Sequence, residues 1–144
     1  MAVKPIPDGY HTVTPYLTVQ GVAQLLEFVT KAFGAEVKFK MPGPGGKIMH
    51  AEFRVGDSMV MTGEARDECP ATPGVLHLYV PDADAVFQKA VAAGAEVVRP
   101  VADQFYGDRS GGVKDACGNT WWISTHIEDV SMEEMKARMA GMGK

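Results

Sequence analysis

The sequence predicts an α+β fold in which two similar modules follow one another along the chain. A near-identical hexapeptide occurs twice, Ala-Phe-Gly-Ala-Glu-Val at 32–37 and Ala-Ala-Gly-Ala-Glu-Val at 92–97. In both places it follows a helical pattern, leads into a strand pattern, and offers glycine where a helix can end in the left-handed conformation. The same order of elements, strand–helix–strand–strand–strand, surrounds each copy. We therefore expect a duplicated unit.

The first module is expected over about 11–64. It begins with a strand from His11, in which apolar and polar residues alternate. Apolar residues at helical spacing then predict a helix over 22–33, which Gly34 ends. The module continues with strands, the last two joined by a two-residue hairpin turn, at 37–40, 49–55 and 59–62.

The second module is expected over about 74–127, after a polar, proline-containing linker at 65–73. Asp82 is a good N-cap for a helix that runs to Gly94. Its strands are expected at 75–80, 97–101, 112–114 and 121–126.

The C-terminal segment predicts a final helix over about 131–142. Ser131 and Glu134 have the spacing of a capping box, in which each residue satisfies a free backbone amide at the helix start. The helix carries an apolar stripe, which we expect to pack on its own domain or on a second copy of the chain, and which consists of Met132, Met135 and Met139.

Composition and charge indicate one domain over 1–144 and exclude several classes of partner. Hydrophobic residues make up 46% and charged residues 22%, as in ordinary globular proteins. The net charge of −4 gives no electrostatic case for binding nucleic acid. No apolar run reaches the ~20 residues that cross a bilayer, and the N-terminus lacks a signal-peptide core. The two cysteines, Cys69 and Cys117, do not have the spacing of metal ligands and make a poor disulfide framework. We therefore expect a protein of the reducing cytoplasm.

Short motifs that together span nearly the whole chain match the pattern of one known superfamily. They are His11–Leu17, Phe28 with Lys31–Ala35, Leu78–Ala85, Tyr106–Arg109, Asp115 with Gly118 and Trp121, and Glu128–Ser131 with Glu134-Met135. On these motifs the chain resembles the vicinal-oxygen-chelate superfamily, which includes glyoxalase I, the bleomycin- and fosfomycin-resistance proteins and the extradiol dioxygenases, and within it the PhnB-like branch. The sequence departs from the family pattern at 115–119, where Asp-Ala-Cys-Gly-Asn replaces the usual Asp-Pro-Phe-Gly-His, and at Val29, where an aromatic residue is usual.

The resemblance implies a curled mixed sheet around a cavity, with the helices outside. It also implies a small-molecule ligand and a homodimer. Because the apolar strand faces must meet the helices, period-2 alternation assigns the other faces to the cavity. The residues expected to line it are Thr14, Tyr16, His50, Glu52, Val60, Thr62, His77, Tyr79, Trp122 and Ser124.

Within this set we expect aromatic rings to stack on a ligand and polar groups to orient it. The expected ligand-binding residues are Tyr16, His50, Glu52, His77, Tyr79, Arg109, Trp122 and Ser124. For Arg109 two roles are open: binding an anionic group of the ligand, or pairing with Asp108 or Asp115 to hold its own loop. Ser124 has no evident base, so a nucleophilic triad is not predicted.

The metal-dependent members of the superfamily hold a divalent ion through His and Glu ligands from both modules. Measured from one module to the other, the corresponding positions here are Thr14, Val60, Val75 and Trp122. These side chains cannot form an imidazole–carboxylate site, so we expect no metal cofactor. The alternative is a divalent metal held by displaced ligands on the cavity face, namely His50, Glu52 and His77.

The sequence thus predicts a glyoxalase/bleomycin-resistance-like protein that binds a small organic molecule without the usual metal. The alternative function is a divalent-metal-dependent lyase, isomerase or dioxygenase with displaced ligands. No catalytic residue is assigned, although a Glu52–His77 pair is a candidate for general acid–base chemistry if the two side chains lie within hydrogen-bond reach. A third interpretation, a purely structural module, predicts that side chains fill the cavity.

Overall fold

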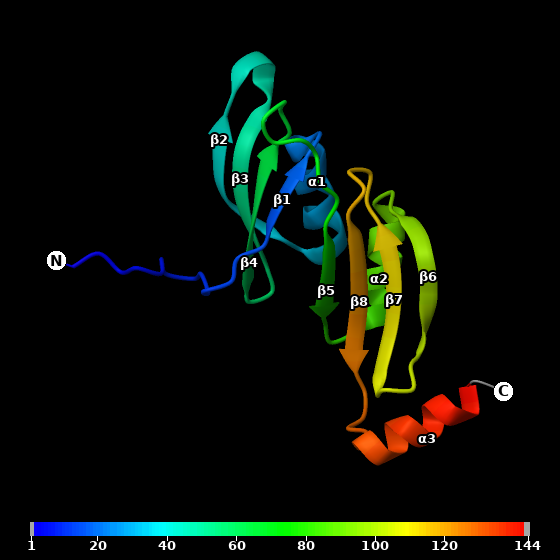
Figure 1. Cartoon of the computed structure of the whole chain (residues 1–144). Helices are drawn as coiled ribbons and strands as arrows, with labels where there is room; N and C mark the ends of the chain where they lie inside the picture. The colour runs from blue at the N-terminus through cyan, green and yellow to red at the C-terminus, as the bar shows by residue number, and fades with distance from the viewer. Residues whose placement is uncertain (1, 143–144) are drawn as a thin grey trace.

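The computed structural model describes residues 2–142 and contains the two tandem modules that the sequence predicts. Figure 1 shows them side by side, followed by a separate C-terminal helix. The first module consists of β1 (Tyr16–Val19), α1 (Val22–Phe33), β2 (Glu36–Pro42), a 3₁₀ turn (Pro44–Gly46), β3 (Ile48–Val55) and β4 (Ser58–Glu64). The second consists of β5 (Val75–Tyr79), α2 (Ala83–Ala92), β6 (Glu96–Asp103), β7 (Asp108–Lys114) and β8 (Thr120–His126), and α3 (Met132–Met142) follows it.

Each module forms a four-stranded mixed sheet with the same topology. The orders are β1-β4-β3-β2 and β5-β8-β7-β6. In both sheets the first strand pairs in parallel with the last strand of its module, and the other neighbours are antiparallel. The α+β class and the duplicated strand–helix–three-strand order are therefore confirmed. The two sheets remain separate and open.

The first helix begins and ends where its sequence allows. Gly34 has a φ of 65° and its amide donates to the carbonyl of Thr30, so the helix ends in the left-handed conformation as predicted. At the other end, the free amides of Gly21 and Val22 donate to the carboxylate of Glu64, at 2.9 and 3.1 Å. A carboxylate from the end of β4 thus caps α1, which fixes the helix against its own sheet.

The core lies between helices and sheets. α1 packs on the first sheet, α2 packs on the second, and the two helices pack on each other. The rings of Phe33 on α1 and Trp121 on β8 are 4.9 Å apart, which joins the two halves of the core. The opposite face of each sheet has no covering helix within residues 2–142.

A single buried carboxylate organises the turn between β7 and β8. Asp115 accepts from the backbone amides of Cys117 and Asn119, from the Asn119 side chain, and from the indole nitrogen of Trp121 at 2.8 Å. Asn119 in turn accepts from the amide of Gly74, just before β5. The network therefore sets the orientation of the indole that faces α1, and it ties together two segments distant in sequence.

Two strand boundaries differ from the prediction by more than two residues. β1 begins at Tyr16 rather than at His11, and Val13 is 82% exposed. Pro15, which has no amide to donate to a ladder, precedes the strand, although its carbonyl still accepts from Met61. β7 begins at Asp108 and includes residues expected in a loop, because Gly107 makes the turn at a φ of 99°.

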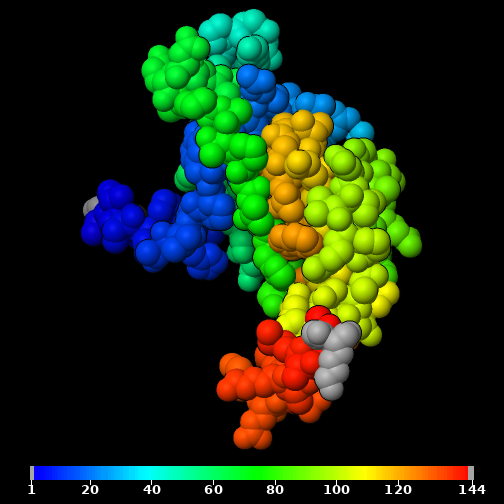
Figure 2. Space-filling model, turned by 45° about the vertical axis from the view of Figure 1, so that its right-hand side comes forward, coloured from blue at the N-terminus to red at the C-terminus, as the bar shows by residue number. Residues whose placement is uncertain are grey.

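The C-terminal helix forms, but it buries no residue. The Ser131 hydroxyl accepts from the amide of Glu134, which is one half of the predicted capping box, while the Glu134 carboxylate accepts from Arg138. Arg138 connects the helix to the body through Glu128 and the carbonyl of Phe105. Figure 2 shows α3, orange to red, standing out from the body. Its methionine stripe stays largely exposed. No helix within the described part of the chain is long and apolar enough to cross a membrane.

Replacing Asp115 with Ala is expected to lower the free energy of unfolding by about 3 kcal/mol, because it leaves several buried donors without an acceptor. Urea denaturation measures this change. Asp57→Ala in the equivalent β3–β4 turn is the matched control, since Asp57 is exposed and, within residues 2–142, its side chain accepts only from Ser58. We expect a change below about 0.5 kcal/mol there. Equal effects of the two substitutions would contradict the role assigned to Asp115.

Candidate functional site

The two uncovered sheet faces hold most of the residues predicted to bind a ligand. On the first sheet, Glu52 and Tyr16 both lie opposite Met61 on β4, and His50 lies opposite Gly63. On the second sheet the register places further predicted residues on one face, namely His77, Tyr79, Trp122 and Ser124. The pairing thus supports the alternation argument for β1, β3, β5 and β8.

A hydrogen-bonded chain of four side chains crosses the open face of the first sheet. Tyr10 donates to Glu52 Oε1, Glu52 Oε2 lies 2.9 Å from His50 Nε2, and His50 Nδ1 lies 3.3 Å from the Tyr16 hydroxyl. The side chains of His50 and Glu52 are only 23% and 18% exposed, whereas Tyr16 is 54% exposed. Sequence reasoning proposed Glu52 with His77; the structure gives Glu52 a different partner, His50, two residues away on the same strand.

A groove of about 330 Å³ lies beside this chain. Tyr16 and His50 line it on one side, and Arg66 and Cys69 in the segment after β4 line it on another. Gly63 forms part of its floor, and a Cβ atom there would overlap the Tyr16 hydroxyl. The glycine is therefore required for the observed position of the phenol.

The second sheet carries a comparable network at its other end. Asp108 is almost fully buried and accepts from the Tyr79 hydroxyl at 2.9 Å. His126 Nδ1 lies 2.8 Å from Asp108, and its Nε2 lies 2.8 Å from Asp129. The hydrogen bonds to Asp129 and then Asp108 raise the pKa of His126, and the hydrogen bond to Asp108 raises the pKa of Tyr79. Neither His126 nor Asp108 is among the residues that the sequence predicts to bind a ligand.

Two further residues predicted to bind a ligand, Ser124 and Trp122 on β8, differ in how exposed they are on the open face. Ser124 is fully buried and donates to Ser110 at 2.8 Å, so its hydroxyl is not on the open surface. Trp122 is half-buried, and the guanidinium of Arg99 lies 4.7 Å from its ring centre. Arg99 was missed because nothing in its sequence context on β6 distinguishes it from a surface cation.

Arg109 has a structural position, with partners other than those predicted. It donates to both carboxylate oxygens of Asp84 on α2, at 2.7 and 3.0 Å, and to Asp103 at 3.0 Å. The partners expected from the sequence bind other side chains: Asp108 accepts from Tyr79 and contacts His126, and Asp115 accepts from Trp121. Because its donors meet two carboxylates of the same chain, Arg109 joins α2 to the β6–β7 hairpin instead of facing a ligand.

Three residues expected in the cavity do not line an open sheet face, although one of them, Val60, borders a cavity of about 800 Å³ between the modules. Val60 is buried against α1's side of the sheet, and Thr62 is also buried there and donates to the carbonyl of Leu17. The reason is the two-residue turn, which pairs Val55 with Ser58 and therefore sets Val60 opposite the core residue Phe53. Thr14 precedes β1 and donates to the carbonyl of His11.

The residues present do not fit the metal that the fold family implies. The four corresponding positions hold a threonine, two valines and a tryptophan, and Val60 faces the core. For the displaced set, His50 and Glu52 contact each other, whereas His77 lies on the other sheet with its ring centre 5.0 Å from that of Tyr79. Among residues 2–142 no group of three His, Cys, Asp or Glu side chains is placed to hold a metal ion.

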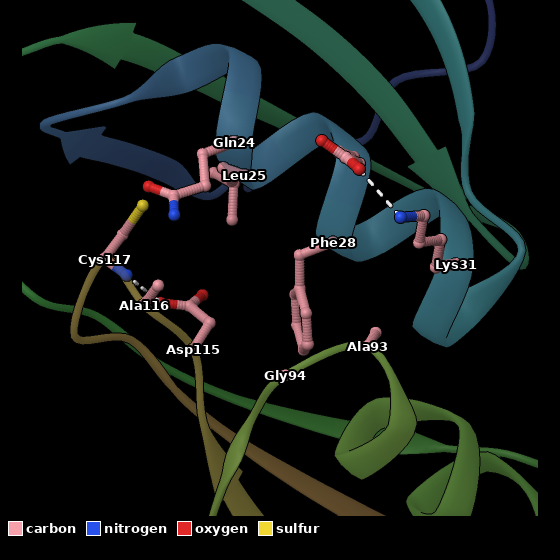
Figure 3. Close-up of a pocket in the computed structure, with 10 residues that line it drawn as sticks. Gln24, Leu25, Phe28, Lys31, Ala93, Gly94, Asp115, Ala116 and Cys117 are labelled. Atoms are coloured by element: carbon pink, nitrogen blue, oxygen red, sulfur yellow. Dashed lines mark hydrogen bonds and ion pairs between the residues drawn. The ribbon is translucent and has the colours of Figure 1, made fainter.

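Two other cavities lie where the modules meet. One, of about 800 Å³, runs between the β3–β4 turn and the free edge of β5. The other, of about 250 Å³, separates α1 from the β7–β8 turn (Figure 3). In the smaller cavity, the Asp115 carboxylate already accepts hydrogen bonds from the β7–β8 turn and from Trp121. Burial raises the pKa of the Cys117 thiol to about 11. Neither Asp115 nor Cys117 therefore offers a free reactive group.

Comparisons with known proteins agree with this architecture. A family model described as the Glyoxalase/Bleomycin resistance protein/Dioxygenase superfamily matches residues 10–123. An uncharacterized protein of Mycobacterium bovis is 37% identical to the chain, and the match covers 91% of this chain and 93% of that protein. An uncharacterized protein of Mycobacterium tuberculosis is also 37% identical, with 91% and 84% covered.

Solved structures share the fold at lower identity. TioX from Micromonospora sp. ML1 aligns with a TM-score of 0.67 and 24% identity, covering 85% of this chain and 99% of TioX. A glyoxalase-related enzyme from Fulvimarina pelagi aligns with a TM-score of 0.65 and 19% identity, covering 80% and 87%. At these identities the likeness establishes the shared fold alone.

The contribution of His126 to stability is expected to depend on pH. Because its pKa is raised in the folded state, the stabilisation is fully present below the unfolded value of about 6.5 and is lost as the pH rises through the folded value. His126→Gln should therefore lower the free energy of unfolding more at about pH 5.5 than at about pH 9. Urea denaturation at both pH values tests this, with His11→Gln, an exposed histidine, as control. A loss that grows with pH would refute the assignment.

Proposed function

This chain belongs to the glyoxalase/bleomycin resistance protein/dioxygenase superfamily, and we propose that it binds a small organic molecule against the open faces of its sheets, without the divalent metal that family members often hold. The observation that carries the proposal is the make-up of these faces. Aromatic rings stand beside hydrogen-bonded polar groups, which is the mixture typical of small-molecule sites. The residues proposed to contact the ligand are Tyr16, His50, Glu52, His77, Tyr79 and Trp122.

The donor chemistry supports a metal-free site. Divalent transition metals in proteins take imidazole, carboxylate or thiolate ligands in a closed geometry. The family's ligand positions offer none of these here. His50 Nε2 and Glu52 Oε2 lie 2.9 Å apart, so these two side chains form a hydrogen-bonded pair.

A homodimer belongs to the same proposal. A ligand site encloses most of its ligand, but Tyr16 and Tyr79 are 54% and 65% exposed in the single chain. A second copy that covers these faces would supply the missing walls. The exposed methionines of α3 supply apolar surface for the same contact. The cytoplasm is the proposed location, since Cys69 and Cys117 are free thiols.

The alternative function is a divalent-metal-dependent lyase, isomerase or dioxygenase that uses His50, Glu52 and His77. One observation favours keeping it: His50 and Glu52 lie together on an open face. Because His77 lies on the other sheet, this site would need His77 from the second copy of a dimer.

Binding can be tested with an apolar fluorescent dye such as anilinonaphthalene sulfonate. We expect saturable binding, and we expect Trp122→Ala to weaken it roughly five- to tenfold, because an aromatic contact contributes about 1 kcal/mol beyond its buried area. Fluorescence titration gives the dissociation constants. Val3→Ala, which removes an exposed apolar side chain of the N-terminal segment, is the control and should leave them unchanged. Equal weakening by both substitutions would refute a site on the sheet face.

Elemental analysis separates the two functions. Protein purified without chelator is expected to contain zinc, nickel, manganese and iron well below one ion per chain, because the donor set does not suit them. Inductively coupled plasma mass spectrometry measures the content. Stoichiometric metal that is lost on His77→Ala would overturn the metal-free proposal and establish the alternative.

A further inference from the structure

The hydrogen-bonded chain on the first sheet has the order of an acid–base relay. Glu52 is a carboxylate that accepts from Tyr10 on one oxygen and meets His50 Nε2 on the other. The ring nitrogen facing a carboxylate carries the proton, so Nδ1 of neutral His50 is the free acceptor. That nitrogen faces the Tyr16 hydroxyl at 3.3 Å. A carboxylate thus orients an imidazole, which in turn faces a phenol.

The phenol is the most exposed member of this relay. His50 and Glu52 are shielded, with side chains 23% and 18% exposed, while Tyr16 is 54% exposed and lines the groove of about 330 Å³. A proton passed between Tyr16 and a molecule in the groove can therefore continue to His50 without crossing open water. Shielding also strengthens the attraction between Glu52 and a protonated His50.

The position of the phenol is built into the sheet. Gly63 on β4 lies opposite His50, and a Cβ atom at that position would overlap the Tyr16 hydroxyl. With any other residue at 63 the phenol would have to leave its place beside Nδ1. Gly63 is therefore a positioning residue for the relay, because its missing side chain leaves the space that the Tyr16 hydroxyl takes.

The groove carries positive charge for an anionic ligand. Arg66 lines it, and its only ion pair in the described chain is a long one, 3.5 Å from the exposed Glu68. The acidic residue that also borders the groove, Glu64, is occupied by the amides at the start of α1. A carboxylate of the ligand would therefore meet a cation that is free to bind it.

From these observations we propose that Tyr16, His50 and Glu52 form a general acid–base site that removes and returns the α-proton of a small 2-oxo acid held in this groove by Arg66. This inference rests on the proposed function and adds a reaction to it. A base of imidazole or phenol strength removes a proton from carbon only where an adjacent carbonyl makes that carbon acidic. The carbonyl acid is thus the class that matches both the base and the cation.

The step balances without a redox partner. His50 Nδ1 takes the phenol proton as the Tyr16 oxygen takes the α-proton of the substrate. The carbon–hydrogen bond breaks, its electron pair forms the carbon–carbon double bond, and the carbonyl π electrons move to oxygen, which gives an enolate. Glu52 stabilises the imidazolium that forms. Return of a proton to either face of the carbon restores the ketone, the phenol and the neutral imidazole.

Exchange of the methylene protons of 2-oxobutyrate in D₂O tests the proposal. ¹H NMR is expected to show loss of the methylene signal faster with the protein than in buffer. Tyr16→Phe and His50→Gln should each reduce the enzymatic rate at least about 100-fold, the usual contribution of a general acid–base group. Tyr106→Phe is the matched control and should keep the rate, because Tyr106 packs on Phe105 away from the groove.

Gly63→Ala should also abolish exchange, because the added Cβ displaces the Tyr16 phenol. Glu52→Gln should change the tautomer of His50, because it removes the carboxylate that faces Nε2. ¹⁵N NMR detects this tautomer change directly. Saturation-transfer difference NMR on the same samples reports binding of 2-oxobutyrate, which Arg66→Ala should weaken. Binding without exchange would overturn the acid–base site and leave the proposed function intact. Absence of binding would overturn the 2-oxo acid as occupant of the groove, while the dye titration tests the proposed function independently.

Discussion

The contact between Phe33 and Trp121 is the constraint on which the rest of the structure depends. It joins the helix of one module to the sheet of the other, with ring centres 4.9 Å apart. Asp115 holds the indole in place through its nitrogen, and α1 and α2 pack beside this contact. Because the two helices turn inward toward a shared core, one face of each sheet is buried and the other is left open.

Each open sheet face carries a network of hydrogen-bonded ionisable side chains. Each holds a tyrosine, a carboxylate and a histidine in one network, Tyr16 with Glu52 and His50 on the first sheet, and Tyr79 with its own partners on the second. Half-buried polar groups are stable only when they are paired, and the members of each network pair with one another, with help from Tyr10 before β1 and Asp129 after β8. The first network is most exposed at the Tyr16 phenol, whereas the second is exposed both at the Tyr79 phenol and at Asp129.

Strand register decides which side chains take part. Alternation within a strand is reliable once one residue of that strand is assigned, and the register agrees with it for β1, β3, β5 and β8. For β4 it was wrong, because the two-residue turn that pairs Val55 with Ser58 sets Val60 and Thr62 against the core. A shift of one residue exchanges the two faces of a strand, so Met61 replaces them on the open side.

The sequence by itself determined the duplicated module, the helix over 22–33 with its glycine end, and the superfamily. It also determined the helix caps, in which Asp82 accepts from the amide of Ala85 and Ser131 from that of Glu134. These depend on local conformation and on periodicity, which neighbouring residues control. Only the tertiary structure decided the partners of the site. Glu52 pairs with His50 instead of His77, and Arg109 pairs with Asp84. Such contacts depend on how strands and helices far apart in sequence are brought together, and local sequence does not encode that distance.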